Sequence, residues 1–281
     1  MGTFLLKQSV GFKPTTFLKP PTKRHRDYFY TETDTANKPV VKEWDYEKII
    51  TEDDTPVDNF PSAKQQRLLV DSLYNSWTPS PDSPFLTDAN IGVFYDPKKP
   101  GIVPDVFLSL GVFVAKDWWK KKNRSYFLSV FGKPPDVVIE IVSNKEGNED
   151  GTKLDIYATI KIPYYVIYDP DKQLEGGELR VYQLNGYSYF CRDDYLMPKL
   201  GLSLTLWTGR YEKQEQTWLR WCDKSGDIIL TGGERAEKER IEKENALNQL
   251  EQERFEKEQA LTQVKQLMAK LQALGISPSD I

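Results

Sequence analysis

The stretch of sequence that decides the fold is Pro135-Asp136-Val137-Val138-Ile139-Glu140-Ile141-Val142-Ser143-Asn144. Residues 137–142 are apolar except for Glu140, and a β-branched run of this kind is typical of a central strand covered on both faces. A buried, unpaired carboxylate is strongly destabilising unless a partner or a metal ion compensates its charge. Glu140 therefore belongs either to a structural ion pair or to a cleft that binds a cation.

The segments on either side of this strand predict an α/β fold. Residues 152–160 predict a helix between two strand-like runs, and strand, helix and strand in this order form a crossover between parallel strands. A hairpin is predicted further on, because Asn185-Gly186 joins two short β-prone runs. The sequence thus predicts a mixed sheet flanked by helices. Its expected strands are residues 90–95, 102–110, 137–142, 164–168, 179–182 and 187–190.

A helix is also predicted before these strands. Leu69, Leu73 and Trp77 recur at i, i+4 and i+8, which is the spacing of one helical face, within residues 62–77. Ser62 is the expected N-cap, and the prolines that follow residue 77 end the helix.

The two ends of the chain differ in composition from the predicted globular domain, residues 41–231. Residues 1–40 combine scattered Lys and Arg with prolines and predict a flexible N-terminal arm. Its basic cluster, residues 19–26, favours a solvated tail over a contact with a phosphate backbone. Residues 232–275 consist of strong helix formers and predict a long polar helix, followed by a tail over residues 276–281.

The C-terminal helix carries an apolar seam with 3-4 spacing. Arg254 and Lys257 occupy the two seam positions in its centre. The spacing favours a coiled coil, and hence a homo-oligomer that is at least a dimer, over a lone solvated helix. The apolar seam residues are Leu247, Leu250, Leu261, Val264, Met268 and Leu271.

Composition excludes several functional classes. The only histidine, His25, lies in the N-terminal arm, which argues against Ser/His/Asp triads and histidine-based metal sites. The two cysteines, Cys191 and Cys222, are too far apart for a CxxC motif. Since no secretory segment precedes these cysteines, we expect a protein of the reduced cytoplasm. No apolar run approaches the roughly 20 residues that a membrane-spanning helix needs, so no membrane partner is expected.

Three charged residues make a candidate catalytic site. Asp105 follows Pro104 at the start of a predicted strand, so its carboxylate and that of Glu140 can converge across the sheet, about 4–6 Å apart, on Mg²⁺ or Mn²⁺. Lys153 lies near the start of the crossover helix, where the helix dipole disfavours a cation, so a specific anionic neighbour is expected. The combination predicts metal-assisted hydrolysis of phosphodiester bonds.

The same residues lie in an ordered set of motifs that resembles a known family. Residues 45–230 are similar to the Uma-two family of restriction endonucleases, within the PD-(D/E)XK nuclease superfamily. The similarity rests on residues 90–95 and 124–126, on the stretch quoted at the outset, and on Val103-Pro104-Asp105-Val106, Lys153-Leu154, Tyr157-Ala158 and Tyr164-Tyr165-Val166-Ile167-Tyr168-Asp169-Pro170.

This resemblance implies roles for the three residues. Asp105 matches the motif aspartate and Glu140 the motif (D/E), both as metal ligands. Val142 stands where the superfamily has its lysine, and Lys153 matches a lysine that has moved to the following helix. In the first helix the chain reads Ala63-Lys64-Gln65-Gln66 where many members have a histidine. A carboxylate from that helix is also missing, unless Asp71 or Glu47 serves.

Two further segments have open interpretations. Glu146, Glu149 and Asp150 are expected in a solvated acidic loop, with a second metal site as the alternative. A segment that interleaves aromatic and basic residues is typical of surfaces that follow a nucleic-acid backbone, although a stacked surface loop accounts for it equally well. Its candidate substrate-binding residues, next to Trp118 and Trp119, are Lys120, Lys121, Lys122 and Arg124.

Two functions follow from the sequence. The first is a Mg²⁺-dependent DNA endonuclease with Asp105, Glu140 and Lys153 as catalytic residues. The alternative is a catalytically idle nuclease fold that binds nucleic acid or assembles through the C-terminal helix. The net charge of −4 is compatible with either, because DNA binding needs only a local basic surface.

Overall fold

A computed structural model describes residues 45–49, 59–80, 83–143 and 148–274 of the chain. The expected N-terminal arm (1–40), Glu146 and the tail (276–281) lie outside the described residues. No helix in the described part of the chain is both long and apolar enough to cross a membrane.

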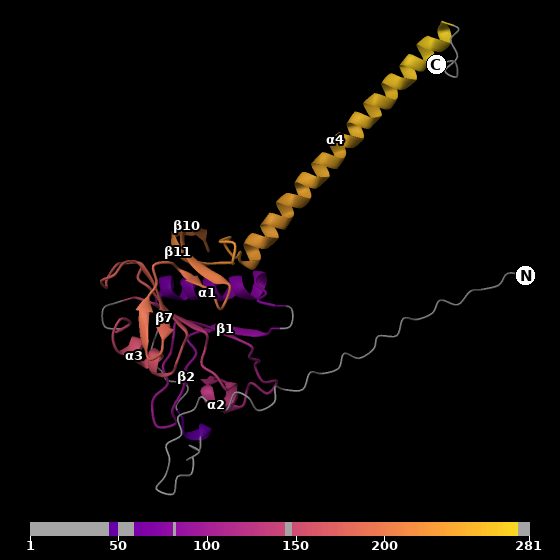
Figure 1. Ribbon diagram of the computed structural model, residues 1–281. Coiled ribbons are helices and arrows are strands. Elements are labelled where there is room, and N and C mark those ends of the chain that lie inside the picture. The colour runs from indigo at the N-terminus through magenta and orange to yellow at the C-terminus, as the bar shows by residue number, and fades with distance from the viewer. Residues whose placement is uncertain (1–44, 50–58, 81–82, 144–147, 275–281) are drawn as a thin grey trace, which may run out of the picture. The chain divides into compact units, whose positions relative to one another are not determined.

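A six-stranded mixed sheet forms the centre of the fold (Figure 1). Among the described strands of this sheet, β5 and β6 are the one parallel pair, and α3 (Thr152–Thr159) connects them, as the sequence predicts. The predicted hairpin is also confirmed, with Asn185 opposite Ser188. The order across the sheet is β1 (Phe85–Ala89), β3 (Val106–Leu110), β5 (Val137–Ile141), β6 (Tyr164–Tyr168), β7 (Leu179–Asn185) and β8 (Ser188–Cys191).

Both faces of β5 are buried, as its sequence requires. Val137, Ile139 and Ile141 pack in a core with α1 (Phe60–Ser76). Val138 and Val142 face the opposite way and pack with residues of α3. Glu140 shares this second face because side chains alternate along a strand. The restriction-endonuclease-like α/β fold is therefore confirmed.

The first helix begins earlier than expected. Its N-cap is Asn59, whose side chain accepts a hydrogen bond from the Ser62 backbone N–H at 2.9 Å, so the prediction of Ser62 as the cap is wrong. Pro61 occupies the second helical position. Proline has no backbone N–H, but an N–H in the first turn would have no acceptor within the helix, so the helix can start there.

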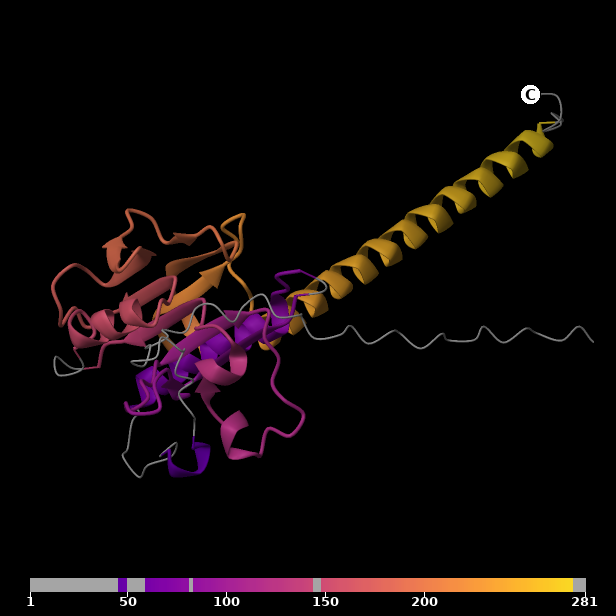
Figure 2. The same cartoon turned by 60° about the horizontal axis from the view of Figure 1, so that its bottom comes forward.

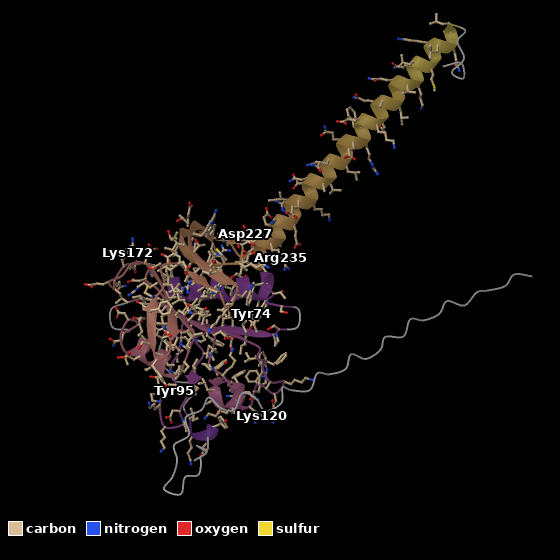
Figure 3. The ribbon with its side chains drawn as sticks, in the orientation of Figure 1. Tyr74, Tyr95, Lys120, Lys172, Asp227 and Arg235 are labelled. Carbon is tan, nitrogen blue, oxygen red and sulfur yellow. The ribbon has the colours of Figure 1, made fainter. Side chains whose placement is uncertain are left out.

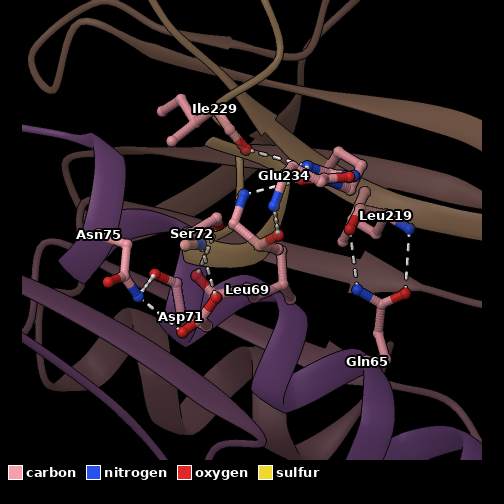
Figure 4. Close-up of polar contacts among 11 residues, drawn as sticks. Gln65, Leu69, Asp71, Ser72, Asn75, Leu219, Ile229 and Glu234 are labelled. Carbon is pink, nitrogen blue, oxygen red and sulfur yellow. Dashed lines mark hydrogen bonds and ion pairs between the residues drawn. The ribbon is translucent and has the colours of Figure 1, made fainter. Parts of the chain in front are cut away.

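A second, three-stranded sheet, orange in Figure 2, packs beside α1 on the same face of the first sheet, and the Tyr168 hydroxyl of β6 donates to its Thr217 carbonyl at 3.1 Å. Gln65 joins helix and sheet: its side chain donates to the Leu219 carbonyl at 2.8 Å and accepts from the Leu219 N–H at 3.0 Å (Figure 4). The Trp221 indole donates to the Leu69 carbonyl at 3.1 Å. The strands are β9 (Leu196–Met197), β10 (Leu202–Tyr211) and β11 (Gln214–Cys222).

Shorter elements complete the domain beside β3. β2 (Val93–Phe94) and β4 (Tyr126–Phe127) form a parallel pair, and the α2 helix (Leu128–Phe131) follows β4 directly. Two 3-10 turns, η2 (Tyr46–Lys48) and η3 (Lys121–Asn123), lie on the same side.

The start of the long C-terminal helix, α4 (Gly232–Ala273), is joined to the globular domain by hydrogen bonds. Thr231 and Glu234 form a capping box, and Asp71 on α1 accepts from the Gly232 N–H at 3.2 Å. The Glu234 carboxylate also accepts a hydrogen bond from each terminal nitrogen of Arg220, a residue that is 1% exposed. Figure 3 labels Arg235 at the start of this helix. The side chains from Arg235 to Lys270 are exposed.

The α4 junction yields a prediction on stability. Glu234→Ala should lower the free energy of unfolding of the full chain by about 3 kcal/mol, because it removes a cap and leaves the buried Arg220 without its carboxylate. Glu237→Ala is the matched control, since its ion pair with Arg240 is exposed to solvent and should contribute little to stability. Urea unfolding monitored by tryptophan fluorescence measures both. Equal effects of the two substitutions would show that the contacts of Glu234 stabilise the fold no more than an exposed ion pair does.

Candidate active site

Glu140 is the centre of the site. It lies in β5 with 1% of its surface exposed, and both of its carboxylate oxygens have partners. The Lys153 ammonium donates to Oε2 at 2.8 Å, and the Tyr157 hydroxyl donates to Oε1 at 2.5 Å. Burial raises the pKa of Glu140 to about 8, against the opposing charge of Lys153 and with some help from the charge of Asp105. The fold therefore holds a carboxyl group that ionises near neutral pH.

Asp105 lies beside Glu140 across the sheet. The register of β3 and β5 pairs Val106 with Ile139, so the preceding residue, Asp105, comes opposite Glu140 and on the same face. One Asp105 oxygen accepts from the Ile141 backbone N–H at 2.6 Å, and the other accepts from the Gln66 side chain at 3.0 Å. The register thus brings the two predicted carboxylates together where β3 begins and β5 ends.

Lys153 reaches the site from the first turn of α3. Its side chain is 27% exposed, and it also lies 3.4 Å from Oε1 of Glu149. Burial lowers the pKa of the ammonium, but the charge of Glu140 and the hydrogen bond to it outweigh this and raise it. Lys153 therefore remains a cation at the open side of the buried carboxylate.

Three residues of the site have roles that sequence reasoning missed. Tyr157 is one turn after Lys153, and this i, i+4 spacing was the available signal. Gln66, within the stretch where the family resemblance leads one to expect a histidine, donates directly to Asp105. Glu149 is 5% exposed, so the prediction that it lies in a solvated loop is wrong. Asp150 is half-exposed and lies 3.9 Å from Arg180.

Of the two carboxylates suggested to stand in for one from the first helix, Asp71 lies away from the site. Asp71 binds Asn75 and the start of α4 instead of facing the site. Glu47 lies in η2, and its side chain is outside the described residues.

The donor atoms suit a hard divalent cation. Asp105 and Glu140 present carboxylate oxygens, and Oε2 of the buried Glu149 has no hydrogen-bond partner among the described residues. The described ranges contain no group of three or more His, Cys, Asp or Glu side chains arranged to hold a metal ion. Two carboxylates are nevertheless a usual protein contribution to Mg²⁺, which keeps several waters and binds substrate phosphates.

The predicted substrate-binding residues form a separate, exposed segment before β4. The Arg124 guanidinium lies 5.9 Å from the centre of the Trp119 ring and donates from Nε to the Trp119 carbonyl at 2.8 Å. Lys120 forms an exposed ion pair with Asp117 at 2.6 Å. Lys121 and Lys122 lie in the η3 turn between them.

Comparison with known proteins identifies the family of the chain. A family model described as "Putative restriction endonuclease", Uma2, matches residues 46–207, which is more than half of the chain. The match includes Asp105, Glu140 and Lys153 and ends within β10, before α4. A search of curated proteins finds no match.

The raised pKa of Glu140 predicts how stability depends on pH in the metal-free protein. Between the ordinary value of 4.5 and about 8, the folded state binds one proton more than the unfolded state, so stability falls as pH rises. The slope contributed by this group is up to about 1.4 kcal/mol per pH unit. Glu140→Gln lacks this titration and resembles the protonated acid, so the unfolding free energy of wild type minus that of the variant should fall steadily from pH 5 to pH 8. Parallel curves would contradict the raised pKa.

Proposed function

This chain belongs to the Uma2 family, and from that premise we propose that it is a metal-dependent DNA endonuclease, a hydrolase of phosphodiester bonds. One observation carries the proposal: Glu140 is buried in a central strand, with Lys153 at 2.8 Å and Asp105 opposite it. An ion pair that served stability alone would gain little from this burial, because desolvation offsets most of its attraction. The arrangement is better suited to binding and chemistry.

Asp105 and Glu140 would hold the cation, Mg²⁺ or Mn²⁺. Such a cation polarises the scissile phosphate and lowers the pKa of a water molecule. The protein prepares this site through fixed hydrogen bonds. Ile141 and Gln66 fix the two oxygens of Asp105, and Tyr157 holds one oxygen of Glu140. The Tyr157 hydroxyl keeps its proton, since burial raises its pKa well above the usual value.

Lys153 is the third member of the proposed site. Its ammonium remains charged, reaches solvent in part and lies against Glu140, so it can bind a phosphate oxygen and stabilise the negative charge that develops during hydrolysis. It would take the place of the strand lysine of the superfamily. The residue at that strand position is Val142, which is buried in the core.

The idle nuclease fold remains the second candidate. The observation that favours it is that the described residues offer no third His, Cys, Asp or Glu side chain grouped with the two carboxylates to hold a metal ion. Metal-dependent cleavage distinguishes the two candidates.

We predict that the protein cleaves plasmid or single-stranded oligonucleotide DNA with Mg²⁺ or Mn²⁺, and that EDTA abolishes cleavage. Lys153→Met should reduce the rate about 10²–10³-fold, as loss of a charge-stabilising donor does in other sites. Lys153→Arg should restore little, because a planar guanidinium does not reproduce a compact ammonium. Lys161→Met, just after α3, is the control, since Lys161 binds the Gly186 carbonyl and lies over the Tyr187 ring.

Two outcomes would contradict the proposal. If purified wild type cleaves none of these substrates with either metal, the idle fold is the better account. If Lys153→Met cleaves as fast as Lys161→Met, cleavage does not depend on the proposed site.

We also propose that the chain forms a homo-oligomer through α4. A 14-residue unit occurs twice in succession, residues 239–252 and 253–266, with nine identical positions. Fourteen residues are two heptads, the period that keeps one face of a helix toward a partner. Each unit contains an apolar seam pair and a basic seam pair, and a glutamate lies immediately before and after each basic pair. A second copy of the same helix therefore offers apolar side chains to the apolar seam pairs and glutamates to the basic seam pairs.

Substitutions within the full chain test this association. Leu261→Glu should reduce the molar mass measured by light scattering at micromolar concentration, because it places a charge on the apolar seam. Phe255→Glu is the matched control, since Phe255 is 62% exposed on α4 but lies off the seam. A wild-type monomer would refute association. An oligomer that survives Leu261→Glu would show that the seam does not hold it.

A further inference from the structure

An aromatic cavity lies on the same face of the central sheet as the candidate site. Its volume is about 420 Å³, which is at the lower end for cavities that bind small molecules. Tyr74 on α1 and Lys120, next to the tryptophans, are both labelled in Figure 3 and indicate this side of the domain. The aromatic side chains that line the cavity are Tyr74, Phe107, Trp118, Trp119, Tyr126 and Phe131.

The floor of the cavity is adjacent to Asp105. Phe107 is two residues further along the strand, so the two side chains share a face and are about 7 Å apart along it. Asp88 pairs with Phe107 across β1 and β3 and therefore belongs to this face as well. A ligand in the cavity would lie within one nucleotide of a phosphate bound at Asp105 and Glu140.

The open wall of the cavity is unusually apolar for a surface. Trp118 and Trp119 are 57% and 77% exposed, and their ring centres are 6.4 Å apart. Arg124 also lines the cavity, with its guanidinium near the Trp119 ring. In proteins that bind single-stranded nucleic acid, the bases stack on exposed aromatic rings of this kind, often with an arginine beside them.

We propose that this cavity binds one unstacked nucleobase of the DNA strand whose phosphate is held at Asp105 and Glu140. This inference rests on the proposed function, and it names the form of the substrate. The base stacks on Trp118 or Trp119 while its sugar and phosphate lead to the carboxylates. Single-stranded or frayed DNA is then preferred to an intact duplex, because an unpaired base leaves its neighbours at the least cost.

Asp88 gives the cavity a preference among bases. An ionised carboxylate only accepts hydrogen bonds, so it favours bases that present an amino group, which are adenine, cytosine and guanine. Thymine presents two carbonyl oxygens around its single N–H and is the least suitable base. Adenine should therefore bind better than thymine in this position.

Fluorescence anisotropy tests the proposal with the full-length protein in EDTA, where no cleavage interferes. The probes are 5′-fluorescein-labelled single strands of 12 adenylates, 12 thymidylates and 12 abasic sites. We expect the adenylate strand to bind at least tenfold more tightly than the abasic strand. Trp119→Ala and Trp118→Ala should remove about tenfold of the adenylate affinity and leave abasic binding unchanged. Asp88→Asn should reduce the preference for adenine over thymine.

Tyr187→Ala is the matched control, because Tyr187 also carries a cation over its ring, Lys161 at 3.3 Å, but belongs to the β7–β8 turn. Three results would overturn the inference. They are equal binding of adenylate and abasic strands, wild-type adenylate affinity in both tryptophan variants, or a change of molar mass in those variants, which would mean that a second copy covers the cavity. Base-dependent binding without any cleavage would instead refute only the proposed catalysis, and cleavage without base dependence would refute only this inference.

Discussion

The burial of one carboxylate, that of Glu140, is the constraint on which the rest of the structure depends. β5 is covered on both faces, so water cannot solvate the charge. The neighbouring elements supply partners instead: α3 contributes Lys153 and Tyr157, and the start of β3 contributes Asp105. The crossover from β5 to β6 places the first of these elements over the strand. A site of this kind reduces stability in order to keep a reactive group in place.

Sequence predicted the part of the fold whose signals are local. The β-branched run around Glu140, the Asn185-Gly186 turn and the spacing of Lys153 and Tyr157 each report on neighbouring residues along the chain. The three-stranded sheet of β9, β10 and β11 was not predicted. It is held on α1 by contacts such as Gln65 with Leu219, which join residues far apart in the sequence.

The site shows the same division. Glu140 was identified by its charge within an apolar strand, Asp105 and Lys153 by their places at a strand start and a helix start, and all three by the resemblance to the family. Gln66 gave no such signal, because an amide on a helix is unremarkable until the helix is packed against Asp105. Glu149 was assigned to a solvated loop because acidic loops usually are, yet tertiary packing covers it and brings it to Lys153.

Direct measurement of metal binding tests the central claim that Asp105 and Glu140 form a cation site. Isothermal titration calorimetry with Mn²⁺ at pH 8 should show saturable binding to wild type, and at least tenfold weaker binding to Asp105→Asn and to Glu140→Gln. Lys161→Met should bind Mn²⁺ as wild type does. Equal affinity in all four proteins would contradict the account, because Glu140 would then be only a buried ion-pair residue.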